Sequence, residues 1–203
     1  MYKKPIIVFE GIEGSGKSYH IKNISNYLKK KKIKFIKIRE PGGSNNSEKI
    51  RRLILNKKSN FNKFTDFLMY MASRNENFHN ILFKNYNKKI ILIDRFIDST
   101  IAYQHYGMGV NLKIIKFINN YILKNIKVNF TFLNTVNKKN LKKRLIKRRN
   151  LNRYDKFKLQ FYSKVQNGFL RLSKNKKNYL IIDSNLSISH NKKIIINKVK
   201  KLI

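Results

Sequence analysis

The chain has 203 residues, no cysteine and a formal net charge of +37, from 47 basic and 10 acidic residues. This length suffices for a domain with a buried core, while the lack of cysteine and of a long apolar stretch excludes a disulfide scaffold and a membrane span. Lysine is spread along the whole chain together with abundant asparagine and isoleucine, so the charge indicates compositional drift rather than a specific nucleic-acid surface.

Short apolar runs alternate along the chain with longer helical patterns. The patterns predict strands near residues 5–9, 34–38, 90–93, 128–133 and 179–183, and helices near 17–31, 46–56, 64–86, 111–124, 137–149, 155–174 and 189–201. This alternation predicts an α/β fold with a doubly wound, five-stranded parallel sheet and helices on both faces. Since no linker or repeat divides the chain, we expect a single domain over residues 1–203, located in the cytoplasm and without a membrane partner.

The first predicted strand leads directly into Gly11-Ile12-Glu13-Gly14-Ser15-Gly16-Lys17-Ser18. This segment matches the pattern G-x-x-x-x-G-K-[ST], in which glycines let consecutive backbone N–H groups point at phosphate oxygens. Lys17 is then expected over the β- and γ-phosphates, and Ser18 is expected to offer its hydroxyl to Mg²⁺. The segment therefore predicts a nucleoside triphosphate site of the P-loop NTPase type, with a plain glycine-rich turn as the alternative.

Two further polar clusters follow predicted strands. The turn Arg39-Glu40-Pro41-Gly42-Gly43, with Arg51 in the next helix, gathers guanidinium groups and indicates a second anion site. Asp94 and Arg95 leave a buried strand at the edge where the P-loop also opens. We expect Asp94 to act on Mg²⁺ and Arg95 to hold phosphoryl oxygens, with an ion pair at the strand end as the alternative.

Tyr70 and Arg74 stand four residues apart in a predicted helix and therefore share one face. An aromatic ring beside a guanidinium can stack on a nucleobase and hydrogen-bond its edge. A core position for Tyr70 is the alternative, because aromatic stripes on helices usually pack inside. The pair adds a candidate base site to the two anion sites.

Taken in order, the segments Phe9–Ser18, Arg39–Gly43 and Asp94–Gln104 resemble the successive signatures of thymidylate kinase, and Asn152–Asp155 resembles that family's lid. The resemblance runs through nearly the whole chain and fits the bacterial type, which has an arginine in the lid. It implies a nucleoside-monophosphate-kinase-like domain with a lid near residues 146–157. It also implies transfer of the γ-phosphoryl group of ATP, with Mg²⁺, to thymidine monophosphate. A P-loop kinase of another pyrimidine nucleotide or of a deoxynucleoside is the alternative.

The resemblance also implies roles for single residues. The expected catalytic residues are Lys17, Arg95, Arg153, Asp94 and Glu13. Glu13 is expected near the acceptor's 3′-hydroxyl, and Arg153, with Arg148 and Arg149 as neighbours, is expected to stabilise transition-state charge. The expected acceptor contacts are Arg39, Arg51, Tyr70, Arg74, Arg95, Thr100, Tyr103 and Gln104. ATP is expected on residues 11–18 and Arg144, and the metal on Ser18 and Asp94. The family implies a homodimer, and Met108 departs from its pattern by standing where arginine is usual.

Overall fold

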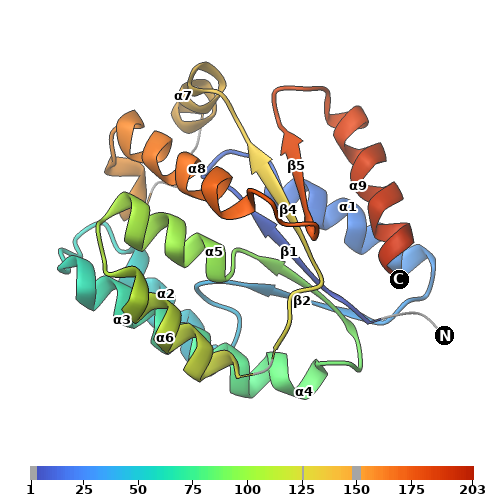
Figure 1. Ribbon diagram of the computed structural model, residues 1–203, viewed down its shortest axis with the longest axis horizontal. Helices are drawn as coiled ribbons and strands as arrows, with labels where there is room; N and C mark the ends of the chain where they lie inside the picture. The colour runs from blue at the N-terminus through green and yellow to red at the C-terminus, as the bar shows by residue number, and fades with distance from the viewer. Residues whose placement is uncertain (1–3, 125, 148–151) are drawn as a thin grey trace.

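Five parallel strands form one sheet in the order β2-β3-β1-β4-β5. The strands are β1 (Ile6–Glu10), β2 (Phe35–Arg39), β3 (Ile90–Asp94), β4 (Phe130–Thr135) and β5 (Tyr179–Asp183). The computed structural model describes residues 4–124, 126–147 and 152–203, and in it helices cover both faces of the sheet (Figure 1). The predicted α/β fold is therefore confirmed. Within those residues, no helix is both long enough and apolar enough to cross a membrane.

The helices follow the predicted order with several shifts. They are α1 (Lys17–Lys30), α2 (Asn45–Leu55), α3 (Lys63–Asn77), α4 (Phe83–Asn85), α5 (Ile97–Thr100), α6 (Leu112–Leu123), α7 (Lys138–Ile146), α8 (Leu159–Ser173) and α9 (Ile188–Leu202). Two π-helical segments, η1 (Phe78–Leu82) and η2 (Ile101–Gly107), and a 3₁₀ segment, η3 (Arg153–Lys156), complete the described part. The predicted helix 64–86 thus runs through α3, η1 and α4.

One helix was predicted to begin too early, and one helical segment was missed. The helix expected from residue 155 begins at Leu159, because the side chains of Asn152 and Asp155 form a capping box that makes η3 a separate short element. The helical segment formed by α5 and η2 was not predicted. Its polar side chains Ser99, Thr100 and Gln104 are buried, so it lacks the polar outer stripe by which an amphipathic helix is recognised.

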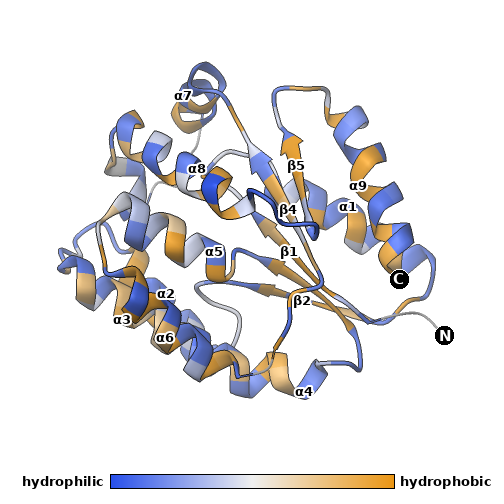
Figure 2. Ribbon diagram, in the orientation of Figure 1, coloured by the Kyte–Doolittle hydropathy of each residue, from blue (hydrophilic) through white to orange (hydrophobic). Residues whose placement is uncertain are grey.

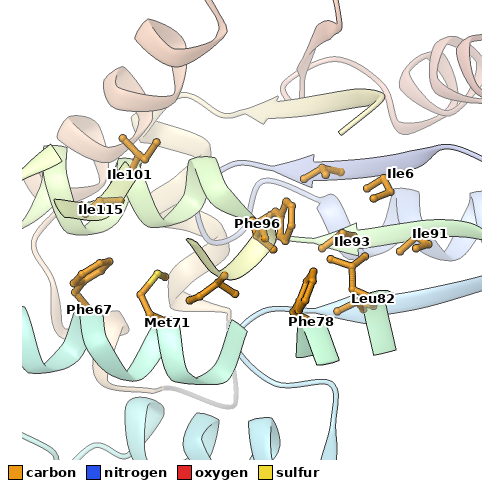
Figure 3. Packing of buried hydrophobic residues seen from close by; sticks show 14 of the residues in the cluster. Ile6, Phe67, Met71, Phe78, Leu82, Ile91, Ile93, Phe96, Ile101 and Ile115 are labelled. Atoms are coloured by element: carbon orange, nitrogen blue, oxygen red, sulfur yellow. The ribbon is translucent and has the colours of Figure 1, made fainter. Parts of the chain in front are cut away.

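Alternate residues of each central strand enter opposite apolar clusters. In β1, Ile6 and Val8 pack on the side of α3 and α6, while Ile7 and Phe9 pack on the side of α1 and α9. Figure 2 shows mostly hydrophobic strands and helices that alternate between hydrophobic and hydrophilic residues, as expected for a sheet covered on both faces. Figure 3 shows Phe78 close to Ile93 in the first of these clusters.

The sheet brings the predicted polar clusters to one edge. Phe9 is in register with Asp94 of β3, and Arg39 of β2 is in register with the same Asp94. The carboxyl ends of β1, β2 and β3 therefore lie side by side. In an open parallel sheet, this edge is where ligands bind, next to the point at which the strand order reverses.

Candidate active site

A cavity of about 480 Å³ lies at the carboxyl ends of β1, β2 and β3. Its lining contains residues from every predicted cluster: Glu13, Gly14, Lys17, Ser18, Arg39, Arg51, Tyr70, Arg74, Asp94, Arg95, Thr100, Tyr103, Gln104 and Arg144. The volume suits a small-molecule ligand. Lys17 and Arg95 open onto the same space, as two facing anion sites require.

The backbone of the P-loop curves around the side chain of Lys17. Lys17 Nζ donates to the carbonyl oxygens of Gly11 and Ile12, both at 2.9 Å. Burial, together with the positive charge of Arg95, lowers the pKa of Lys17 to about 8. Gly11 has a φ of +133°, and a Cβ there would lie 2.2 Å from the carbonyl oxygen of Asn134. The glycine is therefore required both by conformation and by the closeness of β4.

Ser18 and Asp94 meet beside the P-loop, where the Ser18 hydroxyl donates to Asp94 Oδ2 at 3.3 Å. Hydroxyl and carboxylate oxygens are the ligands that Mg²⁺ prefers, and it usually takes its remaining ligands from phosphate and water. Elsewhere in the described ranges, no group of three or more acidic, histidine or cysteine side chains offers another metal site. The pair fits a magnesium ion that is carried in with a nucleotide.

Arg95 joins the P-loop to the segment after β3. Its guanidinium donates to the Gly11 carbonyl at 2.8 Å and to Glu13 Oε1 at 2.9 Å, and the Tyr103 hydroxyl donates to the other oxygen of Glu13. Burial acts to raise the pKa of the Glu13 carboxyl, but the charges of Arg95 and Lys17 outweigh it and lower that pKa. Among the described residues, Arg95 therefore forms its ion pair with Glu13 of the P-loop and not with its neighbour Asp94.

Glu10, which the sequence analysis left without a role, holds the start of α5. The Glu10 side chain is buried, and its Oε1 accepts hydrogen bonds from the backbone N–H groups of Phe96 at 2.9 Å and Ser99 at 3.2 Å. Burial and the nearby charge of Asp98 raise its pKa to about 7. Because Arg95 has a left-handed φ of +67°, these bonds stabilise a turn that is otherwise unfavourable. Glu10 thereby sets the direction of α5 and η2.

Arg74 is fixed in the wall of the cavity by partners from two other elements. Its Nε donates to Glu40 Oε2 at 2.7 Å, and its Nη1 donates to the Asn119 side-chain oxygen in α6. The guanidinium is almost fully buried, so these contacts determine which of its N–H groups face the cavity. Glu40 stood in a predicted cluster without a role, whereas Asn119 has no motif around it that would have marked it.

Gln104 offers an unused donor in the wall of the same cavity. The residue is 1% exposed, lines the cavity, and its side-chain nitrogen has no hydrogen-bond partner in the part of the chain that the structure describes. A buried donor without a partner is costly and points to a ligand acceptor. Tyr70, four residues before Arg74, lines the same space. Side chains from α3 and η2 that were predicted to hold a base therefore line one cavity.

The turn after β2 and the helix that follows it carry two arginines of the predicted second anion site. Arg39 pairs with Glu48 at 2.8 Å while remaining half exposed, and Arg51 donates to the Pro41 carbonyl at 2.5 Å. Burial and the charge of Arg39 lower the pKa of Arg51. Both guanidiniums line the cavity with Arg95. Three guanidiniums around one space make a site for a doubly charged anion such as a phosphate ester.

Comparison with known proteins agrees with this geometry. The family model described as thymidylate kinase matches residues 9–195. This chain belongs to the thymidylate kinase family. A thymidylate kinase from Sulfurihydrogenibium sp. is 35% identical over 198 residues, covering 96% of each chain, and one from Thermosipho africanus is 39% identical over 186 residues, covering 91% and 92%. The crystal structure of thymidylate kinase from Ehrlichia chaffeensis superposes with a TM-score of 0.78 at 28% identity, covering 97% and 98%.

The arginines expected around the donor nucleotide of a thymidylate kinase take different places. Arg144 lies against the P-loop, where its guanidinium donates to the carbonyls of Gly14 at 2.7 Å and Ser184 at 2.6 Å. Arg153 is not among the described residues that line the cavity, and its guanidinium donates to Asp66 of α3 instead. Arg148, Arg149 and the middle of the predicted lid lie outside the described residues. Met108, the departure from the family pattern, packs against a buried apolar cluster.

Proposed function

We propose that this chain transfers the γ-phosphoryl group of ATP to thymidine monophosphate and releases thymidine diphosphate. The observation that carries the proposal is that one cavity is lined both by P-loop residues and by the three guanidiniums of Arg39, Arg51 and Arg95. Lys17, Ser18 and Asp94 lie at its P-loop end, while Arg95 and the base-site residues line the rest. The membership of the thymidylate kinase family supports the same reaction.

Phosphoryl transfer asks the protein mainly for position and for compensation of negative charge. The P-loop N–H groups and Lys17 hold the donor phosphates, and Arg39, Arg51 and Arg95 hold the acceptor phosphate. Ser18 and Asp94 would hold Mg²⁺, which neutralises charge on the phosphate oxygens when it is bound. Arg95 donates to both Gly11 and Glu13 of the P-loop, so these bonds tie the start of the segment after β3 to the loop that holds the donor phosphates.

The base site supports a pyrimidine acceptor. Tyr70 supplies a ring for stacking, and Arg74 and Gln104 supply N–H donors for the carbonyl groups of thymine. Tyr103 is held through its hydroxyl by Glu13, and the family resemblance assigns its ring to the 2′ side of the acceptor sugar. The geometry therefore supports a thymine base on a deoxyribose sugar.

The test is a coupled assay of ADP release across a panel of acceptors. Thymidine monophosphate should be used with a kcat/KM at least about 100-fold above those of adenosine and guanosine monophosphate. A purine base would leave buried N–H donors of the base site without acceptors, which opposes its binding. Deoxyuridine monophosphate, deoxycytidine monophosphate and thymidine belong in the panel. Preference for deoxyuridine or deoxycytidine monophosphate would indicate a kinase of another pyrimidine nucleotide. Preference for thymidine would indicate a deoxynucleoside kinase. Equal use of all acceptors contradicts the base-site assignment.

We also propose that the chain forms a homodimer through the outer face of α6. Ile114, Phe117 and Tyr121 are spaced to share one face of that helix, and they are 40%, 71% and 78% exposed. A second copy of the chain is the favoured partner, because the family implies a dimer. An apolar face also lets two highly charged chains associate without bringing their charged side chains together.

Light scattering should give twice the chain mass for the wild type and the monomer mass for the double variant Phe117→Asp/Tyr121→Asp. Ile188→Asp is the matched control, since Ile188 is 60% exposed at the start of α9, which packs on the opposite face of the sheet from α6. A monomeric wild type, or a double variant that stays dimeric, contradicts the proposal. The cytoplasmic location stays a prediction.

A further inference from the structure

Asp66 is a buried carboxylate that the reaction described above does not use. It lies in the first turn of α3 and is 1% exposed. Tyr70 and Arg74 follow it by four and eight residues, so all three side chains stand along one face of the helix. Asp66 is therefore the next residue on the helical face that forms the base site.

Both carboxylate oxygens of Asp66 accept hydrogen bonds from residues that are distant in the sequence. Oδ1 accepts from the guanidinium of Arg153, and Oδ2 accepts from the hydroxyl of Tyr154 at 2.7 Å. These partners are 87 and 88 residues away in sequence. A buried carboxylate is tolerated only when it is paired and hydrogen-bonded, and here Arg153 supplies the charge. That leaves the second oxygen to hold Tyr154.

Tyr154 is part of the cavity wall. Its ring meets Tyr70 edge-on, with centroids 6.3 Å apart, and meets Tyr103 edge-on at 6.0 Å. The Tyr162 hydroxyl donates to the Tyr154 carbonyl at 2.8 Å, which holds the backbone from the other side. The Tyr154 hydroxyl donates to Asp66 and accepts from Arg153 at 3.4 Å, so the Asp66–Arg153 pair fixes the polar end of a ring that is otherwise packed in an apolar cluster. Three tyrosine rings thus surround one end of the cavity.

We propose that Asp66 is a positioning residue for the acceptor site: through Tyr154 it fixes the third aromatic wall against Tyr70 and Tyr103, and Arg153 serves as the counter-charge of Asp66. This inference rests on the proposed function and changes the role that the resemblance implies for Arg153. Arg153 acts through Asp66 on acceptor binding, and does not itself meet the transferred phosphoryl group.

The direct test is calorimetric binding of thymidine monophosphate, measured without ATP. Asp66→Asn keeps the size of the side chain but loses the charge and one acceptor oxygen. Its Kd for thymidine monophosphate should rise at least about tenfold, as expected for lost hydrogen bonds to a buried charge, while the KM for ATP stays unchanged. Glu76→Gln is the matched control: it neutralises a carboxylate of the same helix that bonds Asn46 and Asn80 and has no contact with Tyr154 in the described residues.

Two more variants keep the test decisive if Asp66→Asn folds poorly. Tyr154→Phe removes only the hydroxyl and keeps the ring, so the Kd should rise about threefold, the effect of one hydrogen bond. Arg153→Gln should raise the Kd as Asp66→Asn does, and the double variant should be no worse than the more damaging single one, because the two residues act as a unit.

Three outcomes would overturn the proposal. The first is a lower melting temperature of Asp66→Asn with an unchanged Kd, which leaves Asp66 a purely structural role. The second is an Arg153→Gln variant with reduced kcat and unchanged Kd, which places Arg153 on the phosphoryl group. The third is additive losses in the double variant. Wild-type turnover of thymidine monophosphate tests the proposed function separately, so a failure of either claim is recognised as such.

Discussion

Lys17→Ala should lower kcat/KM for ATP by at least about 10³-fold, or about 4 kcal/mol of barrier, because the lost ammonium faces the charge that develops between the donor phosphates. Lys17 is the cation that the P-loop holds within reach of an anion, with its Nζ bound to the Gly11 and Ile12 carbonyls. No other described lysine lines the cavity, so none can replace it. Steady-state assays with thymidine monophosphate measure the change.

The fold should survive this substitution. The folded-state pKa of Lys17 is lowered from 10.5 to about 8, so the protonated side chain opposes folding at neutral pH and its removal relieves that opposition. The melting temperature, followed by circular dichroism, should therefore not fall by more than a few degrees. Lys22→Ala, an exposed lysine of the same helix, is the control for charge and should keep full activity. Full activity of Lys17→Ala contradicts the phosphate role.

Arg95→Ala should lower kcat/KM for thymidine monophosphate by at least about 10³-fold and change the KM for ATP far less. Arg95 lines the cavity and donates to both Gly11 and Glu13, so its loss removes an acceptor-phosphate contact and frees the Glu13 carboxylate. The measurement is a pair of KM and kcat determinations, with each substrate varied in turn.

Two further variants separate charge, geometry and stability. Arg95→Lys keeps the charge and the same left-handed backbone requirement but loses the planar fork, so its activity should lie between those of the wild type and Arg95→Ala. Arg95→Ala/Glu13→Gln also neutralises the buried carboxylate that has lost its guanidinium and keeps only the Tyr103 hydroxyl, so it should recover melting temperature without recovering activity. If Arg95→Ala raised the KM for ATP as much as the KM for thymidine monophosphate, Arg95 would act only on the P-loop.

Local geometry explains why the P-loop was predictable. Gly11, Gly14 and Gly16 have φ values of +133°, +67° and +87°, conformations that glycine adopts without strain, and the lysine and serine follow at fixed spacing. The same holds for the sheet, since the run Ile90–Ile93 is buried on both faces and its lack of alternation predicted that burial. Information of this kind is carried by residues next to each other in the chain.

The pairings inside the site were not predictable. Glu40 meets Arg74 across 34 residues, Asn119 meets Arg74 across 45, and Asp66 meets Arg153 across 87. With 47 basic residues for 10 acidic ones, each carboxylate has many possible partners in the sequence. Only the packing of helices on the sheet selects one of them.

The sequence by itself determined the phosphate-binding loop, the five strands, most of the helices and the family, because these depend on spacing along the chain. The tertiary structure decided how the site is held together. Glu10 of β1 accepts hydrogen bonds from the start of α5. Asp66 of α3 accepts hydrogen bonds from Arg153 and Tyr154, which lie 87 and 88 residues later in the sequence. The physical reason is burial: a carboxylate removed from water must find donors in space, wherever the fold brings them.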